Sequence, residues 1–185
     1  MYKEDVASIT SFVNTKGLEG FKSVFYFVLG SIRTRFYQIN DITTDIKVEG
    51  LNSKHIWGHK TKAYNDFNIL AKDLLFAIQN SNDIPILTRN IMQINGIGLA
   101  KSNFLLQLMG KETACLDVHN LVQLGIPQEY FKNKNKVDEY LEIVKQDSSE
   151  NWWNNWCQTI ADRYPTRFKT ANEVSKLHVK AITDV

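Results

Sequence analysis

Apolar residues recur at helical spacing through most of this chain. In the clearest example, Thr61 to Asn80, an apolar side chain returns every third or fourth position, with charged residues between. We expect this segment to be a helix with one face in a core. The buried stripe should consist of Ala63, Phe67, Leu70, Leu74 and Ile78.

Two shorter helices should follow, separated by a glycine-containing turn. Pro85 suits the first turn of a helix, which we expect to end at Asn95-Gly96. The next helix should begin near Leu99 and run to Gly110, a residue type that commonly ends helices. The side chains of the first of these helices that face inward should be Leu87, Ile91 and Ile94.

The remaining pattern is also helical. Asp117 can cap a helix that reaches Leu124, and two further helices are predicted at Val137–Val144 and Trp152–Tyr164, with a polar loop at Asp147–Glu150. The apolar run Val24–Leu29 fits a buried helix or a strand, and periodicity does not separate the two.

We therefore expect an all-α fold in one domain over residues 1–185, possibly built as two closely packed helical lobes. Within it, a hairpin should occupy residues 84–110, a loop and helix residues 111–125, and C-terminal helices residues 136–185.

Composition narrows the class of protein. The hydrophobic share of 43% and charged share of 23% are those of a globular protein. Cys115 and Cys157 are too few for an all-cysteine zinc site or an iron–sulfur cluster. The chain has no apolar run long enough to span a membrane and no secretory signal, so we expect no membrane partner.

Charge distribution is more informative than the net charge of +2. No acidic residue occurs from Ile84 to Lys111, and this stretch contains Asn95-Gly96-Ile97-Gly98. Two glycines around one apolar residue permit a tight turn whose backbone N–H groups can approach a phosphate. The helix that follows adds a partial positive charge. A plain turn between helices is the alternative; the surrounding charge favours sequence-independent binding of duplex DNA.

The region beyond the turn makes the pattern more specific. Ser102-Asn103 follows the turn, and Leu116-Asp117-Val118-His119 comes later, with Asp117 nineteen positions after Gly98. Together these segments resemble the hairpin and aspartate of the helix-hairpin-helix DNA glycosylases, a superfamily that includes endonuclease-III-like and oxoguanine glycosylases. The resemblance covers roughly Gly58 to Leu124 and, weakly, the tryptophan-rich C-terminal helix. Asn95 stands where the family usually has proline.

The resemblance implies that Asp117 is catalytic. Breaking an N-glycosidic bond builds positive charge on the sugar, which a nearby carboxylate stabilises while it orients water. Asp117 as a helix cap alone is the alternative from spacing, and the two roles can coexist.

Strand-cutting relatives carry a lysine where this chain has Ala100. Lys101 is one residue further, a rotation of about 100° on a helix, so we expect it to point away from the sugar and toward a phosphate. The sequence thus favours a monofunctional glycosylase, with AP lyase activity through a catalytic Lys101 as the alternative.

The resemblance also assigns the remaining site residues. Phe104, Trp153 and Trp156 would form the base pocket, and main-chain carbonyls of Met92, Ile94 and Ile97 could hold a sodium or potassium ion. No other cofactor and no iron–sulfur cluster is implied. The predicted DNA contacts are Asn95, Gly96, Ile97, Gly98, Leu99, Ala100, Lys101, Ser102, Asn103 and His119.

A glycosylase must also extrude its target base and fill the gap. Ile32-Arg33-Thr34-Arg35 is the nearest equivalent of the segment that supplies the inserted side chain in relatives. Other aromatic residues that could stack on the extruded base, or belong to the core, are Phe25, Tyr26, Trp57 and Trp152.

We predict an enzyme of base excision repair that hydrolyses the N-glycosidic bond of a damaged, mismatched or modified base in double-stranded DNA. It should act as a monomer in the cytoplasm of a bacterial or phage-infected cell. Two alternatives stay open: a noncatalytic helix-hairpin-helix DNA-binding module, and a phage enzyme of the same fold acting on hypermodified pyrimidines.

Overall fold

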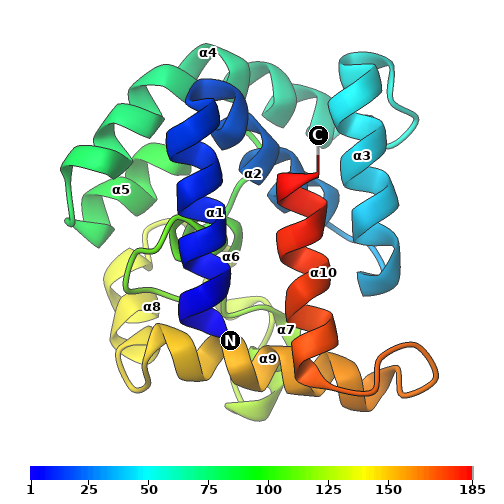
Figure 1. Cartoon of the computed structure of the whole chain (residues 1–185). Coiled ribbons are helices and arrows are strands. Elements are labelled where there is room, and N and C mark those ends of the chain that lie inside the picture. The colour runs from blue at the N-terminus through cyan, green and yellow to red at the C-terminus, as the bar shows by residue number, and fades with distance from the viewer. Residues whose placement is uncertain (185) are drawn as a thin grey trace.

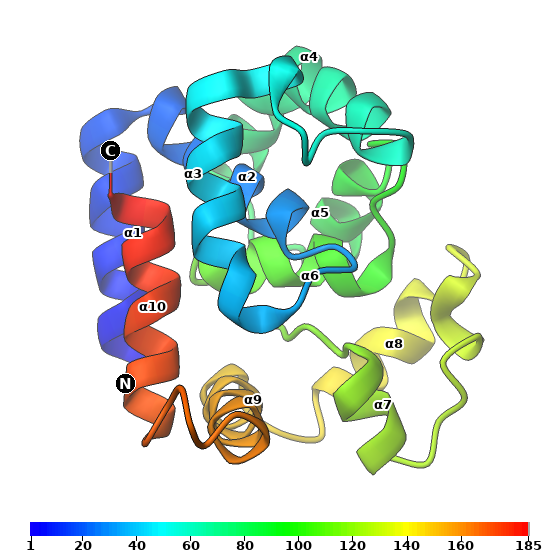
Figure 2. The same ribbon diagram turned by 90° about the vertical axis from the view of Figure 1, so that its right-hand side faces the viewer.

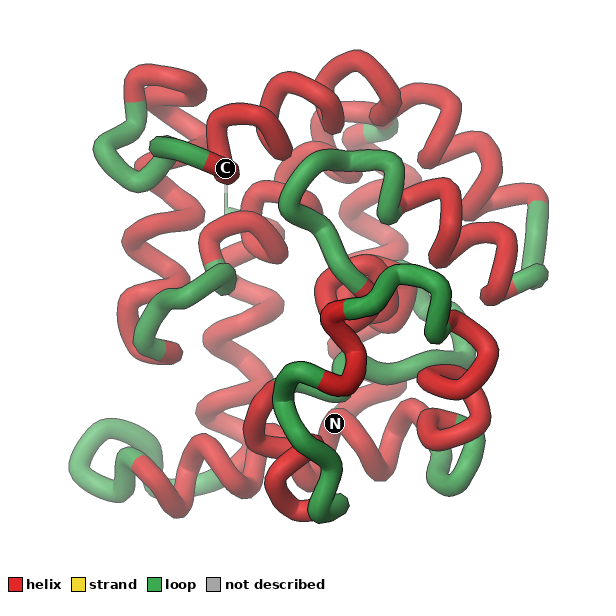
Figure 3. The backbone as a smooth tube through the Cα atoms, turned by 180° about the vertical axis from the view of Figure 1, so that it is seen from behind, coloured by secondary structure: helices red, strands yellow, loops and turns green. Residues whose placement is uncertain are grey.

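The computed structural model describes residues 1–184, and all regular structure within them is helical, as expected (Figure 1). Figure 3 shows helices joined by loops, with no strand in the described chain. No helix among these residues combines the length and apolar character needed to cross a bilayer.

The α-helices are α1 (Tyr2–Lys16), α2 (Leu18–Gly30), α3 (Ile39–Glu49), α4 (His59–Asn80), α5 (Ile84–Ile91), α6 (Leu99–Leu108), α7 (Val118–Gln123), α8 (Val137–Val144), α9 (Ser149–Arg163) and α10 (Ala171–Thr183). Three short 3-10 turns are η1 (Phe36–Gln38), η2 (Gly50–Asn52) and η3 (Tyr130–Lys132).

Helix α2 lies at the centre of the main bundle. It contacts α1, α3, α4, α6 and α10 (Figure 2). The apolar run Val24–Leu29 therefore forms a helix rather than a strand, and it is apolar all round because neighbours surround it. Phe25 of α2 stacks on Phe67 of α4 with ring centroids 3.7 Å apart. Phe25 and Tyr26 are thus core residues of α2 and not base-stacking candidates.

The helices expected from periodicity are largely confirmed. Helix α4 buries the predicted stripe except Leu70, which is half-buried. Asp83 caps α5 by accepting a hydrogen bond from the Ile86 N–H at 3.0 Å, and Gly110 follows α6 with φ +77°. Helix α8 has the predicted bounds.

One loop prediction is wrong. The polar segment Asp147–Glu150 already contains the start of α9, because the Ser148 hydroxyl accepts a hydrogen bond from the Asn151 N–H at 3.1 Å and caps the helix. Polar residues that favour loops also favour helix N-termini, so composition alone did not locate this boundary.

A second, smaller apolar cluster lies under α7, η3 and α8, against Met92 and Leu99 (Figure 2). Its centre is Tyr140, whose hydroxyl accepts from the Leu116 N–H at 2.7 Å and donates to the Ala114 carbonyl at 2.9 Å. These bonds fix the extended segment that leads to Asp117.

Candidate functional site

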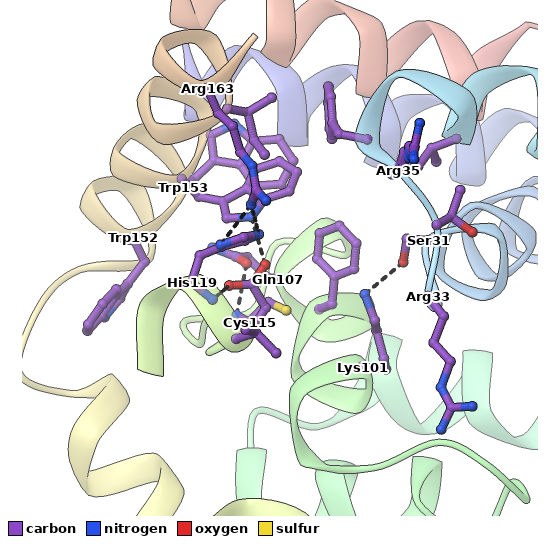
Figure 4. A pocket seen from close by; sticks show the side chains of 18 of the residues that line it. Ser31, Arg33, Arg35, Lys101, Gln107, Cys115, His119, Trp152, Trp153 and Arg163 are labelled. Atoms are coloured by element: carbon purple, nitrogen blue, oxygen red, sulfur yellow. Dashed lines mark hydrogen bonds between the residues drawn. The ribbon is translucent and has the colours of Figure 1, made fainter. Parts of the chain in front are cut away.

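The candidate site is a cavity of about 530 Å³ between the loop after α2, α6, the start of α7 and α9 (Figure 4). Asp117, Lys101 and the three residues predicted for the base pocket all line it. We call it the Asp117 cavity. Residues from four separate parts of the sequence therefore meet at one place.

One wall of the Asp117 cavity is aromatic. The ring centroid of Trp156 lies 6.0 Å from that of Trp153, 6.3 Å from that of Phe104 and 5.3 Å from that of Phe36. The Trp153 indole N–H donates to the buried Asp5 carboxylate of α1 at 3.0 Å. The polar edge of Trp153 is thereby satisfied within the bundle.

Asp117 sits where this wall meets the N-terminus of α7. Its Oδ1 accepts from the N–H groups of His119 at 2.9 Å and Asn120 at 3.2 Å, which caps α7. Its Oδ2 accepts from the Trp156 indole N–H at 3.0 Å. A carboxylate oxygen can accept more than one bond, so Oδ2 keeps acceptor capacity while the other oxygen caps the helix.

Lys101 lines the same cavity as Asp117. Its ammonium donates to the Ser31 hydroxyl at 2.8 Å and lies 5.2 Å from the centre of the Phe104 ring (Figure 4). Residues three apart share a helix face, so Lys101 and Phe104 both face the cavity. Whether Lys101 meets a phosphate or the sugar of a bound strand stays a prediction.

Cys115 lines the same cavity. Burial raises the pKa of its thiol to about 12, while Lys101 lowers it and Asp117 raises it to smaller extents. The thiol is thus protonated and unsuited to nucleophilic attack at neutral pH.

The remaining lining residues are rich in positive charge. Arg33, Arg35 and Arg163 join Lys101, and Asp117 is the single acid among the lining residues. Arg163 Nη1 lies 3.0 Å from Nε2 and 3.3 Å from Nδ1 of His119. A guanidinium only donates, so in this contact Arg163 is the donor and a His119 ring nitrogen is the acceptor.

The segment predicted to supply an inserted side chain borders the same cavity. Arg33 adopts φ +54°, a left-handed conformation that a residue with a side chain rarely takes. Such a conformation persists only where the surrounding structure holds it, and it is common at functional sites.

The glycine hairpin is anchored by an acidic residue from elsewhere in the chain. Asp66 of α4 accepts from the Asn95 backbone N–H at 2.9 Å and from its side-chain amide at 2.6 Å. These bonds lower the pKa of Asp66 below its usual value. The segment from Ile84 to Lys111 has no acidic residue of its own, but the folded chain brings Asp66 against it. Asn95 therefore has a structural partner.

Four of the predicted DNA contacts have buried side chains: Ile97, Leu99, Ser102 and Asn103. A contact of these four residues with DNA would be made by their backbone, as expected for the hairpin, and it stays a prediction. The Asn103 side chain donates to the Leu99 carbonyl at 2.9 Å and accepts from the Thr113 hydroxyl at 2.6 Å. It ties the hairpin to the segment that carries Asp117.

Gly96 is exposed, and Gly98 and Ala100 are half-buried. Gly98 has an extended conformation, and a Cβ placed on it would meet nothing within 4 Å. Its lack of a side chain is not required by packing within the chain. This is the property expected of a position that a ligand approaches closely.

Two of the three carbonyls proposed to hold a monovalent ion have partners. The Met92 carbonyl accepts from the Lys134 ammonium at 2.8 Å, and the Ile94 carbonyl accepts from the Ile97 N–H at 3.2 Å. The positive charge next to Met92 is therefore supplied by the chain itself. Within residues 1–184, no group of three or more His, Cys, Asp or Glu side chains is placed to hold a metal.

Several lining residues were not predicted as site residues, among them Ser31, Gln107, Cys115 and Arg163. Arg163 ends α9, and its approach to His119 depends on how α9 packs against α7. No pattern local to either segment signals this contact. No family model, curated protein or solved structure matched the chain.

Proposed function

We propose that this protein is a DNA glycosylase that hydrolyses the bond between sugar and base at a damaged, mismatched or modified nucleotide in duplex DNA. The observation that carries the proposal is the position of the Asp117 carboxylate in an aromatic cavity next to an exposed glycine hairpin. The resemblance of hairpin and aspartate to the helix-hairpin-helix glycosylases supports it.

The cavity has the chemistry that base excision needs. Its volume of about 530 Å³ falls in the range of small-molecule sites, about 300–1,000 Å³. Trp153, Trp156 and Phe104 offer apolar surface on which an extruded base can stack. The rim arginines suit the phosphates on either side of the extruded nucleotide.

Asp117 would act as the base departs. The C1′–N bond breaks with its electrons moving to the base, positive charge grows on the sugar, and the carboxylate stabilises that charge. Water then forms the new bond to C1′, and its proton passes to the departing base or solvent. The Trp156 N–H and the α7 backbone hold the carboxylate in place for this step.

The position of Lys101 favours a second candidate, a combined glycosylase and AP lyase. Its nitrogen lines the cavity that holds Asp117. An unprotonated amine there could attack C1′ in place of water, forming an imine that later eliminates the 3′ phosphate and cuts the strand.

The experiment that tests the proposal is a panel of duplexes, each carrying one altered base, including hypermodified pyrimidines. Each is incubated with the protein and then treated with alkali to reveal abasic sites. Excision from at least one duplex is expected. Binding without excision across the panel would contradict the proposal and favour the noncatalytic module.

On the excised duplex, Asp117→Asn should slow excision about 10²- to 10³-fold. Asparagine caps helices as well as aspartate, so the fold should be kept. Asp83→Asn is the matched control, because Asp83 caps α5 in the same way and does not line the cavity. Equal rates for the two variants would reduce Asp117 to a helix cap.

A further inference from the structure

A second cavity of about 420 Å³ lies beside the Asp117 cavity. The loop after α2, part of α3, and the segment that enters α4 enclose it, and Arg33 and Thr34 line both cavities. We call it the Lys60 cavity, after a lysine in its lining that the reaction at Asp117 does not use.

Lys60 is in an unfavourable position for a cation. Lys60 as a whole is only 6% exposed. Its ammonium has no hydrogen-bond or ion-pair partner in the part of the chain that the structure describes. It lies in the first turn of α4, where the helix dipole disfavours positive charge. Burial and, to a smaller extent, the like charge of Lys101 lower its pKa.

The side chains around Lys60 add positive charge instead of neutralising it. Arg33 and Lys54 line the same cavity and make no ion pair among the described residues, and the one acid in the lining is Asp41. His55 and His59 also line it. Several cations without an ion-pair partner among the described residues thus line one cavity, which gives it the electrostatics of an anion site.

An exposed aromatic ring stands at the same place. Trp57 is 63% exposed, and its ring is edge-on to that of His59, with centroids 6.3 Å apart. His59 in turn packs against the hairpin, since a Cβ on Gly96 would lie 3.4 Å from its ring. The cavity, the exposed tryptophan and the hairpin thus form one continuous surface.

We propose that the Lys60 cavity binds the phosphate group of a nucleotide whose base stacks on Trp57. Exposed tryptophan beside clustered cations is the combination that binds unpaired nucleotides. The inference rests on the proposed function only in taking the ligand to be nucleic acid. The phosphate can belong to a DNA strand at the hairpin or to a free nucleotide.

The first test needs no reaction and no altered base. Thermal unfolding is followed while inorganic phosphate, thymidine 5′-monophosphate or thymidine is added at constant ionic strength. Phosphate and the monophosphate should raise the midpoint of the parent protein, the monophosphate at lower concentration. Lys60→Met should need a concentration of either ligand at least about tenfold higher to reach the same rise in midpoint.

Lys72→Met is the matched control, because Lys72 is an exposed lysine of the same helix outside both cavities. It should respond as the parent does. Trp57→Ala should respond to phosphate as the parent does but lose the advantage of the monophosphate. Without ligand, Lys60→Met should unfold at or above the parental midpoint, since it removes an unpaired buried charge; Lys60→Gln serves if the methionine variant folds poorly.

A salt titration of duplex binding identifies the source of the phosphate. If it belongs to the DNA strand, Lys60→Met should reduce the slope of log affinity against log salt by about 1, while Lys72→Met leaves it unchanged. If Lys60→Met has the same salt slope as the parent but has lost its response to the monophosphate, the site binds a free nucleotide.

If Lys60→Met and Lys72→Met behave alike with phosphate, with the monophosphate and with duplex, the proposal is overturned. That result would leave excision by Asp117 untouched. Absence of excision from every duplex would in turn leave the phosphate titrations valid, so the two proposals can fail separately.

Discussion

At the scale of single residues, the helix cap at Asp117 is compatible with the catalytic role proposed for this residue. One carboxylate oxygen receives the backbone N–H groups of His119 and Asn120, and the other receives the indole N–H of Trp156. Capping therefore positions the group and does not consume it.

Lys101 carries the prediction that separates the two candidate reactions. Its hydrogen bond to Ser31 and its place over the Phe104 ring suit an ammonium, which cannot attack the sugar. We therefore expect borohydride to trap little covalent complex on an excised duplex, and strand cutting to require added alkali. A strong trapped band that disappears in Lys101→Met, while Lys111→Met keeps it, would establish the lyase.

The contacts that sequence reasoning missed at residue level have a common cause. The anchoring of Asn95 by Asp66 and the approach of Arg163 to His119 join positions 29 and 44 residues apart. Such contacts depend on how helices pack, and no local pattern contains that information.

At the scale of elements, the hairpin allows binding to be separated from folding. Gly98 has φ −108° and open space around it, so Gly98→Ala should change the free energy of unfolding by less than about 0.5 kcal/mol. Its methyl group would nevertheless stand where a phosphate approaches, and duplex affinity should fall. Titration with duplex and denaturant unfolding measure the two effects.

Gly96→Ala provides the contrast. Gly96 has φ +79°, a conformation in which alanine costs about 1–2 kcal/mol. This variant should lose stability as well as affinity. If Gly98→Ala binds duplex as the parent does, the hairpin is only a turn between helices.

Helix positions were predictable where an apolar stripe and a clear cap coincide, as in α4, α5 and α8. Helices α1, α3 and α10 lacked a comparable signal, and α2 was ambiguous because a helix enclosed on all sides loses its polar face. Among the elements that line the Asp117 cavity, α6 and α7 lie close to their predicted bounds, whereas α9 begins before its predicted start.

At the scale of the whole molecule, the two apolar clusters meet at the Asp117 cavity. The main bundle supplies the aromatic wall, and the smaller cluster around Tyr140 supplies the segment ending at Asp117. Relative placement of the two clusters therefore determines the geometry of the site. No sequence pattern specified this arrangement beyond the spacing from hairpin to aspartate.

His178 links the stability of the main bundle to pH. It is 1% exposed and packs against four rings, those of Trp156, Phe36, Trp153 and Phe27, with centroids 4.8 to 5.2 Å away. One ring nitrogen bonds to the Val174 carbonyl at 2.8 Å, and the other has no partner among the described residues. Burial lowers the pKa of His178 from 6.5 to about 3.

The sign of the effect follows from proton binding. Between pH 6.5 and 3 the unfolded chain holds a proton on this histidine that the folded protein lacks, so stability is complete above pH 6.5 and falls as pH is lowered. For one such proton, the free energy of unfolding falls by at most about 1.4 kcal/mol for each pH unit. The buried Asp5, whose pKa is raised mainly by desolvation, acts in the opposite direction at lower pH.

We therefore expect denaturant unfolding between pH 7 and 5 to show His178→Gln losing less stability than the parent, because glutamine does not titrate and can still donate to Val174. His55→Gln, a change outside the buried aromatic cluster, should retain the parental pH dependence. Parallel curves for His178→Gln and the parent would mean that His178 accepts a proton within the folded bundle, and that water or movement of α10 reaches its unpartnered nitrogen.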